Sequence, residues 1–421
     1  MTPFSPLRRA AVSLALATAV LAACAPTPPV SAPVPVPAKP VAPEPPAPSR
    51  ARDLPLAAGP AVADLPGWRD NDPARALAAF RASCRALTIR TDQSGLTQPG
   101  DWAEVCSAAV SATDARAFFE SRFATLVVGD GSGLNTGYYE PELAGDRMAS
   151  PAYPVPLYKR PPELIDVDLG AFRDTLRGQR IAGRIEGRRL VPYADRAAIE
   201  DGALAGRGLE LAWAADPYEV FFLQIQGSGR VRLPDGQVMR VGYDGQNGHP
   251  YVGIGRKLLD MGLLAKGQAS MQGIIAWARA NPDKAREVMR LNPSFVFFRE
   301  LTGPGPLGAM NVALSPDISV AADPSFVPLG APLWLVSARP DVARPARQLP
   351  FSRLMVAQDT GGAITGANRL DVFWGPGADA AIIAGGMSWR GKMLLLLPVA
   401  VVDRLLASPP ESGSTASPAG R

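Results

Sequence analysis

The spacing of hydrophobic residues changes once along the chain, close to Thr125. Between 71 and 87 apolar residues recur every three or four positions behind an Asn-Asp-Pro start, which predicts a helix. The segment 103–123 keeps this spacing and predicts one or two further helices. Beyond Thr125 the apolar runs become short, and Gly or Pro bounds each of them. This punctuation is typical of β-barrels, so we expect a mainly β protein with an N-terminal helical part.

Two helical segments interrupt the β-like runs of the second part. The spacing predicts them at 251–262 and 271–292, the latter ending before Pro293. The predicted strands are 124–129, 137–141, 153–161, 188–193, 219–233, 237–245, 295–301, 317–321, 332–336, 353–359, 370–375 and 392–400. The sequence contains no internal repeat.

The first 24 residues have the pattern of a bacterial export signal. Two arginines precede an apolar run of about fourteen residues, which is too short for an ordinary membrane span. The run ends in Leu-Ala-Ala-Cys24 and resembles a lipobox, so we expect an acylated Cys24 and a lipid anchor. Ala25, in place of aspartate, favours the outer membrane. The alternative is a plain signal peptide in which this cysteine is buried.

Segments of unusual composition flank the predicted folded body. Prolines recur at every second or third position after Cys24, which excludes a helix or a central strand and predicts an extended tether over 25–65. Residues 406–421 are rich in Ser, Gly and Pro and are expected to be disordered. The total length of 421 residues suggests that two domains lie between these ends.

Composition narrows the possible functions. A formal net charge of +4 gives no reason to expect a nucleic-acid partner. A single histidine, His249, argues against a histidine-based metal cluster. Apart from Cys24, only Cys84 and Cys106 remain, and an exported chain with one such pair is expected to form a disulfide. Two free buried thiols are the alternative.

The stretch VAQDTGGAITGANRLDVFWG, residues 356–375, is the strongest candidate for acid chemistry. Asp359 ends one β-like run and Asp371 opens the next, with glycines between them that let backbone approach a ligand closely. Because an apolar setting disfavours the charged carboxyl, both side chains are candidate general acids with a raised pKa. The alternatives are an Asx turn over Thr360 and an ion pair between Asp371 and Arg369.

Two other hydrolase mechanisms are excluded by the residues themselves. Asp359-Thr360-Gly361 is the tripeptide of aspartic proteases, but that chemistry needs two such loops and the sequence contains one. Ser228 with His249 lacks the Gly-x-Ser-x-Gly elbow of many serine hydrolases. A mechanism that relies on carboxyl groups therefore remains the best supported.

Seven short segments follow one another in order over about 136–389. They are TGYYEP at 136–141, YPVPLY at 153–158, QIQGSG at 224–229, NGH at 247–249 with Tyr251 and Ile254-Gly255, NPSFVFF at 292–298, SVAAD at 319–323, and LMVAQDTGGAI at 354–364 running on to Asp371. Each segment alone is a weak signal. Together they resemble the membrane-bound lytic murein transglycosylase A (MltA) family.

The resemblance implies a fold and an activity. The fold is a double-psi β-barrel domain built from two chain segments, 66–138 and 246–405, with a smaller β domain, 139–245, inserted between them. A groove between these domains holds the glycan strand of peptidoglycan. The enzyme cleaves the β-1,4 bond between N-acetylmuramic acid and N-acetylglucosamine and leaves a 1,6-anhydro end, without a metal or an organic cofactor. The implied location is the bacterial periplasm, at the outer membrane, and a murein synthesis or division complex is a conceivable partner.

The resemblance also assigns residues. The family's catalytic acid matches Asp371, and Asp359 matches a second, supporting aspartate. Asp371 would protonate the glycosidic oxygen and then accept the proton of the C6 hydroxyl, which attacks the anomeric carbon. The motifs supply further candidate substrate contacts: Thr136, Tyr138, Tyr139, Glu140, Gln224, Gln226, Ser228, His249 and Asp323.

Several of these contacts have a structural alternative. Tyr138 and Tyr139 are expected to pack on sugar faces, or else in the core of a strand. Gln224, Gln226 and Ser228 are expected to alternate on one face of a strand and to bind N-acetyl and hydroxyl groups, or else to form an ordinary polar face.

The remaining alternatives concern single residues and the activity as a whole. Glu140 is a rival general acid to Asp371. The alternative role of His249 is a structural hydrogen bond, and the alternative role of Asp323 is to cap a turn. The alternative functions are a hydrolytic muramidase on the same scaffold and a non-catalytic peptidoglycan-binding lipoprotein.

Overall fold

The structure is a computed structural model that describes residues 48–176, 179–303 and 305–407. The predicted signal peptide with its lipid site, residues 25–47 of the tether and most of the C-terminal tail lie outside these residues. The acylation of Cys24 therefore stays a prediction. The prediction of a tether that extends to residue 65 is wrong in its last part, because Leu56–Ala58 form a strand that pairs with residues 126–128, and Ala51, Val62 and Leu65 are buried in the core. None of the helices in the described ranges has both the length and the hydrophobicity that a membrane-spanning segment needs.

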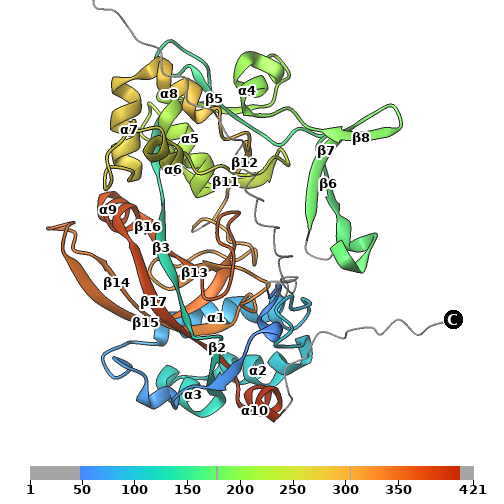
Figure 1. Cartoon of the computed structure of the whole chain (residues 1–421), viewed down its shortest axis with the longest axis vertical. Helices are drawn as coiled ribbons and strands as arrows, with labels where there is room; N and C mark the ends of the chain where they lie inside the picture. The colour runs from blue at the N-terminus through green and yellow to red at the C-terminus, as the bar shows by residue number, and fades with distance from the viewer. Residues whose placement is uncertain (1–47, 177–178, 304, 408–421) are drawn as a thin grey trace, which may run out of the picture. The chain divides into compact units, whose positions relative to one another are not determined.

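The largest sheet has eight strands and contains a closed ring. Its strands are β1 (Leu56–Ala58), β2 (Phe123–Val128), β3 (Ser132–Glu140), β13 (Ser319–Ala322), β14 (Pro332–Pro340), β15 (Gln348–Asp359), β16 (Leu370–Pro376) and β17 (Ser388–Pro398). They are ordered β1-β2-β17-β14-β15-β13-β16-β3, and β17 also pairs with β3 (Figure 1). This second pairing joins the six strands from β17 to β3 into a ring without a free edge.

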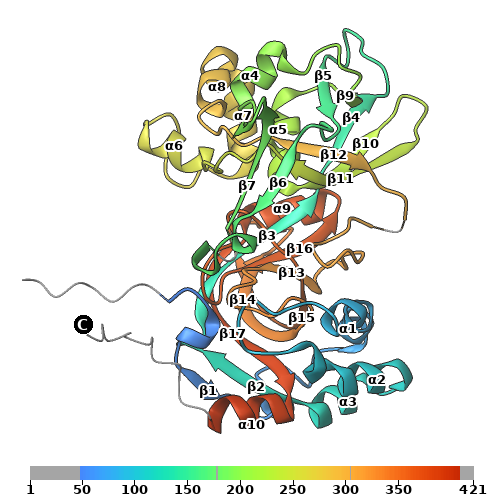
Figure 2. The same cartoon turned by 90° about the vertical axis from the view of Figure 1, so that its right-hand side faces the viewer.

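Helices cover this sheet and complete its core. They are η1 (Ala51–Asp53), η2 (Val62–Asp64), α1 (Ala74–Leu87), η3 (Pro99–Trp102), α2 (Ala103–Ser111), α3 (Ala115–Arg122), α9 (Ala378–Gly386) and α10 (Val399–Ala407). Helix α10 packs against β1 and β2 at one end of the sheet (Figure 2). Strand β15 lies against α1, so its apolar run 354–357 is fully buried on both faces and does not alternate with polar residues.

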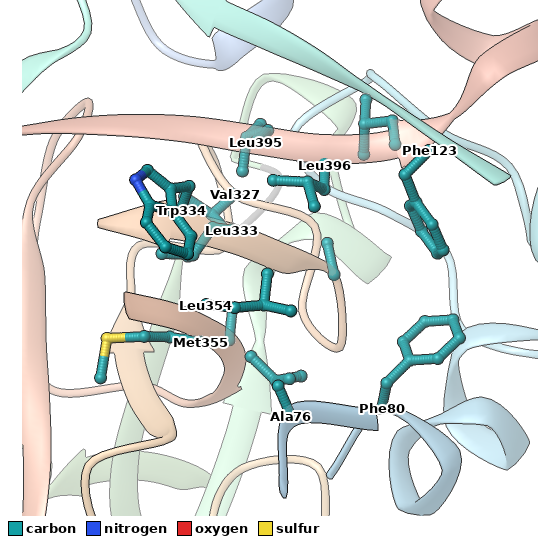
Figure 3. Packing of buried hydrophobic residues seen from close by; sticks show 14 of the residues in the cluster. Ala76, Phe80, Phe123, Val327, Leu333, Trp334, Leu354, Met355, Leu395 and Leu396 are labelled. Carbon is teal, nitrogen blue, oxygen red and sulfur yellow. The ribbon is translucent and has the colours of Figure 1, made fainter. Parts of the chain in front are cut away.

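The core of the larger sheet is dense and partly aromatic. Trp334 of β14 pairs with Leu354 of β15, Leu333 of β14 pairs with Leu395 of β17, and the rings of Phe80 and Phe123 lie 5.6 Å apart (Figure 3). Each fully buried side chain of this size stabilises the fold by roughly 1.5–3 kcal/mol. The ring is therefore the rigid part of the molecule on which functional side chains are mounted.

A second sheet has six strands in the order β12-β11-β10-β4-β9-β5. Its strands are β4 (Glu142–Asp146), β5 (Val155–Tyr158), β9 (Glu210–Ala214), β10 (Ser228–Arg232), β11 (Val238–Gln246) and β12 (Val296–Glu300). The associated helices are α4 (Arg196–Ala198), η6 (Ile199–Ala203), α5 (Pro217–Gln226), α6 (Ile254–Asp260), α7 (Met271–Ala280) and α8 (Pro282–Met289). A separate three-stranded sheet contains β6 (Ile165–Asp168), β7 (Arg180–Glu186) and β8 (Arg189–Pro192), with η4 (Leu169–Ala171) and η5 (Asp174–Leu176).

The prediction of one strand over 219–233 is wrong in its first half, which forms helix α5. Asp216 caps this helix by accepting hydrogen bonds from the backbone of Tyr218 and Glu219, and Pro217 occupies the first turn. Gly227 ends the helix with a φ of 77°. Residues 220–223 are all apolar, and a run this short does not distinguish a buried strand from a buried helix by its period.

Two other expectations differ from the structure in detail. The predicted helix 271–292 is broken into α7 and α8 at Asn281, because the ring of Pro282 is compatible only with a new first turn. The sequence placed the return to the barrel near residue 246. The strand pairing instead keeps β12 beside β11, and the chain rejoins the larger sheet between Glu300 and Ser319.

Cys84 of α1 and Cys106 of α2 form a disulfide with their Cα atoms 5.5 Å apart. We expect the double change Cys84→Ser and Cys106→Ser to lower the free energy of unfolding by about 3 kcal/mol, because the bridge closes a loop of 22 residues in the unfolded chain. Urea unfolding followed by circular dichroism measures this effect. A loss below about 1 kcal/mol would show that the cross-link restricts the unfolded chain little.

Candidate active site

Four neighbouring strands bring the two predicted acids into one row. Thr136 of β3 pairs with Asp371 of β16, Asp371 pairs with Ala321 of β13, and Ala321 pairs with Asp359 of β15. Residues paired in this way point to the same face of a sheet, so both carboxyl groups share a face with Ala321 between them. The backbones of the two aspartates lie two strands apart, which is about 10 Å.

A β-bulge sets the direction of Asp359. Val320 pairs with Ala357 and the next residue of β13 pairs with Asp359, so Gln358 is the extra residue of β15. The Gln358 side chain is buried and hydrogen bonds to Ala79 and Ser83 of α1. The bulge therefore turns one side chain into the core and the next into the row of acids.

Asp371 has one hydrogen-bond donor and an apolar setting. Thr136 Oγ1 donates to Asp371 Oδ1 at 2.6 Å, and Oδ2 has no partner among the described residues. Burial raises the pKa of Asp371 to about 6; the hydrogen bond from Thr136 and the charge of Arg369 oppose this shift, and the charge of Asp359 adds to it. The residue keeps some solvent exposure. It is thus a carboxyl group that is partly protonated near neutral pH and open to a ligand.

Asp359 is held by three donors. Its Oδ2 accepts from Tyr138 Oη at 2.8 Å, and its Oδ1 accepts from the backbone of Ala309 at 3.0 Å and of Thr360 at 2.9 Å. Burial raises the pKa of Asp359, while these hydrogen bonds favour the carboxylate and lower it. The contact with Thr360 is local, but the other two donors come from distant parts of the chain.

An apolar cluster fills the space around the two acids. Tyr138, Leu314, Ala321, Ile364 and Phe373 are all buried and pack together. The Tyr138 ring lies 5.2 Å from that of Phe373, centroid to centroid. The cluster removes water from both carboxyl groups, which explains their raised pKa. Because its ring is packed, Tyr138 contributes its hydroxyl to the site and has no free face for a sugar.

Tyr139 points to the opposite face of β3, since successive residues of a strand alternate. Its backbone N–H donates to Gln226 Oε1 at 3.0 Å, and burial raises the pKa of its phenol to about 12. Together with Gly137, Tyr139 and Gln226 line a cavity of about 260 Å³ between β3, α5, α7 and α9. The structure therefore separates Tyr139 and Gln226 from the row of acids.

Gln224, Gln226 and Ser228 do not alternate on one strand face, because the first two belong to helix α5. Gln224 is buried and accepts a hydrogen bond from Arg196 Nη2 at 2.7 Å. Ser228 begins β10 and is also buried. The expected polar strand face is wrong, and the structure gives Gln224 a role in the core of the six-stranded domain.

Glu140 lies where β3 leaves the larger sheet, away from the two aspartates. It is 1% exposed and forms ion pairs with Arg230 at 3.1 Å and Arg240 at 3.7 Å. Both arginines belong to the six-stranded sheet. The carboxylate therefore fastens β3 to that sheet, and the structure does not bring it to the row of acids.

His249 and Asp323 are both engaged in internal hydrogen bonds. His249 Nε2 lies 2.8 Å from the carbonyl oxygen of Tyr193. Asp323 accepts from the backbone of Ser325 at 2.9 Å and of Gly366 at 2.7 Å. Asp323 thereby caps a turn and ties down the loop between β15 and β16, as its structural alternative anticipated.

The structure adds site residues that sequence reasoning missed. Ala309 donates to Asp359 from a loop that carried no signal, and Leu314 and Ile364 complete the apolar cluster. Ala321 is visible in the sequence only as a small residue in a strand-like run. In the described ranges, no group of three or more His, Cys, Asp or Glu side chains is arranged to hold a metal ion.

Two family models match the chain. The model described as the MltA specific insert domain matches residues 134–299, and the 3D domain matches residues 318–397. The second match contains β13 to β17 almost entirely, with both aspartates.

Individual relatives agree with these matches. Membrane-bound lytic murein transglycosylase A of Vibrio cholerae is 37% identical over 204 residues, which cover 47% of this chain and 54% of the relative. The chain thus spans about half the length of this curated relative. A crystal structure of MltA from Neisseria gonorrhoeae is 40% identical with a TM-score of 0.68, covering 82% of this chain and 92% of that one.

A third comparison is with a ligand-bound structure. The crystal structure of Escherichia coli MltA with bound chitohexaose is 26% identical with a TM-score of 0.61, covering 82% of this chain and 94% of that one. The family predicted from seven short motifs is confirmed. The chain belongs to the membrane-bound lytic murein transglycosylase A family.

Proposed function

We propose that this protein is a peptidoglycan lytic transglycosylase. It cleaves the β-1,4 bond between N-acetylmuramic acid and N-acetylglucosamine and forms 1,6-anhydro-N-acetylmuramic acid. The observation that carries the proposal is the single, partly exposed carboxyl group of Asp371, whose pKa is raised to about 6. The names of the relatives and the chitohexaose bound to the Escherichia coli protein support this substrate class.

Asp371 serves as acid and then as base. Thr136 holds Oδ1, so Oδ2 is free to donate its proton to the glycosidic oxygen. The resulting carboxylate then accepts the proton of the C6 hydroxyl as that oxygen attacks the anomeric carbon. Because the attack is intramolecular, no water needs a second carboxylate to activate it, and effective molarity lowers the barrier.

Asp359 acts as the ionised partner. Burial raises its pKa, but three donors oppose this shift where Asp371 has one, so Asp359 is the better carboxylate of the two. Its negative charge stabilises an oxocarbenium-like transition state and raises the pKa of Asp371. Their different hydrogen bonds thus give the two carboxyl groups different roles, with Asp371 as the acid and Asp359 as the carboxylate.

We also propose the type of barrel, the identity of the inserted domain and the cellular location of the protein. The closed ring of β17, β14, β15, β13, β16 and β3, built from two chain segments, supports the double-psi β-barrel. The six-stranded sheet is the inserted domain that forms the other wall of the groove. The Cys24 signal and the membrane-bound relatives support an outer-membrane lipoprotein in the periplasm.

We expect Asp371→Asn to lower kcat at least about 100-fold with folding intact, because the amide cannot donate an acidic proton while its oxygen can still accept from Thr136. Mass spectrometry of digested sacculi measures the 1,6-anhydro ends, and thermal unfolding is the control. Turnover retained in this variant would remove Asp371 from the role. Reducing muramic acid ends from the unchanged protein would instead identify a hydrolytic muramidase.

The pH dependence follows from the protonation of Asp371. As the acid must be protonated at the start, kcat/KM is expected to fall as the pH rises above about 6. In Asp359→Asn the neighbouring negative charge is lost, so the pKa of Asp371 decreases and this alkaline limb moves to lower pH. Rates on a soluble glycan between about pH 4 and about pH 8 measure both effects. A limb that stays in place or moves upward would contradict the assignment.

The variant Glu140→Gln distinguishes a structural role of Glu140 from the role of general acid. The change leaves two arginines beside a neutral side chain, so we expect the free energy of unfolding to decrease by about 3 kcal/mol. Chemical unfolding measures this loss. If Glu140 were the general acid, the variant would instead be inactive at unchanged stability.

A further inference from the structure

A second row of side chains lies beside the row of acids, on the same face of the larger sheet. Arg390 of β17 pairs with Leu134 of β3, and Arg369 donates from Nη1 to the Leu134 carbonyl at 3.1 Å. Leu134 precedes Thr136 by two residues, and Arg369 precedes Asp371 by two. Side chains two positions apart on a strand share a face, so Arg390 stands on the face that carries Thr136 and Asp371. Arg369 directly precedes β16, and its charge acts on Asp371.

A third cation continues this face. Lys392 of β17 pairs with Ser132, two positions further along β3. The outward direction is clear from burial, because Arg390 and Lys392 are exposed while Gly391 and Met393 between and after them are buried. Arg369, Arg390 and Lys392 therefore form a cationic strip that starts next to Asp371 and follows β3 and β17. These two strands lie side by side (Figure 1).

The strip has more cations than neighbouring carboxylates, because in the described ranges only Asp371 and Asp130 act on it, at Arg369 and Lys392. Among the described residues, none of its three cations has an acidic side chain within ion-pair distance. Lys392 donates to the backbone carbonyl of Asp130 at 2.9 Å and interacts electrostatically with the exposed Asp130 carboxylate. Arg369 donates to the carbonyls of Leu134 and Leu370, and burial lowers its pKa. The charge of Asp371 acts on Arg369, so the exposed Arg390 is the cation of the strip that has neither an ion pair nor a neighbouring carboxylate among the described residues.

We propose that the cationic strip binds carboxylates of the peptide stem on the N-acetylmuramic acid at the cleavage site. This inference rests on the proposed function and specifies its preferred substrate. The stem is attached through the lactyl group of that sugar and carries free carboxylates, whereas the sugars themselves carry none. Neutral sugars do not need a cationic surface, so the positive charge of the strip fits the stem and not the glycan.

The spacing of the strip fits an extended peptide. Along a strand, Arg390 lies about 7 Å and Lys392 about 14 Å beyond the row of Asp371, since the rise is about 3.4 Å per residue. An extended peptide advances at a similar rate. Carboxylates two and four residues from the sugar thus meet successive cations when the stem follows β17.

The test compares two substrates that differ only in their stems. Purified full-length protein is assayed on glycan strands that carry stems and on the same strands after an amidase has removed them. We expect unchanged protein to have the higher kcat/KM on stem-bearing strands. The measured quantity is the ratio of kcat/KM on stem-bearing strands to kcat/KM on stem-free strands. Arg390→Gln is expected to lower this ratio about fivefold, and Arg390→Gln with Lys392→Gln about tenfold or more, as for exposed ion pairs.

Two controls test whether the ratio depends on the charges of the strip in particular. Arg69→Gln removes the same charge from an exposed arginine in the segment before α1, and the ratio is expected to stay at the wild-type value. Raising the salt from about 0.05 M to about 0.5 M is expected to lower the ratio of the unchanged protein, because salt screens exposed charges. Arg369 is left unchanged, since its charge also acts on Asp371.

The outcomes are distinguishable. An unchanged ratio in the folded double variant would overturn the proposal. An unchanged ratio together with lost binding to phosphatidylglycerol-containing vesicles would also overturn it and assign the strip to lipid headgroups. Absence of anhydro products from both substrates with the unchanged protein would refute the proposed function itself.

Discussion

Strand β3 is the constraint on which the rest of the structure depends. It pairs with β16 and β17 and so closes the ring, and at Glu140 it passes on to the six-stranded sheet. One face of this strand carries Thr136 and Tyr138, which hold the two aspartates. A shift of its register by one residue would turn both side chains away from the acids, so the chemistry depends on this single pairing.

The glycines of β3 make this position possible. A Cβ atom on Gly137 would lie 2.7 Å from Trp374 Nε1 and 3.0 Å from the Ala384 backbone. A Cβ on Gly133 would collide with the backbone of Asn368. Both positions therefore require glycine, because the loop before β16 at Gly133, and β16 with helix α9 at Gly137, approach the strand more closely than a side chain permits. In the Thr-Gly-Tyr motif, Thr136 and Tyr138 thus donate the hydrogen bonds to the aspartates, and Gly137 allows the strand to pack closely against its neighbours.

The two buried carboxyl groups show how similar settings give different acids. Both have lost water to the same apolar cluster, and burial raises both pKa values. Asp359 has three donors and Asp371 has one, so the first is stabilised as a carboxylate and the second can hold a proton. The cationic strip then begins on the open side of Asp371, where an anionic substituent of a bound sugar would extend.

The sequence by itself determined the local features and the family. Helix α1, the strands around both aspartates and the disulfide partners follow from period, punctuation and cysteine count, which depend on neighbouring residues. Helix α5 was missed because a fully buried run has no period. Tertiary structure alone decided that Ala321 separates the acids, that Glu140 is an internal ion-pair partner, and that Tyr138 and Tyr139 serve opposite faces. These relations join different strands, with Thr136 and Asp371 lying 235 positions apart in the chain, and the register between such strands is fixed by packing, which no local pattern encodes.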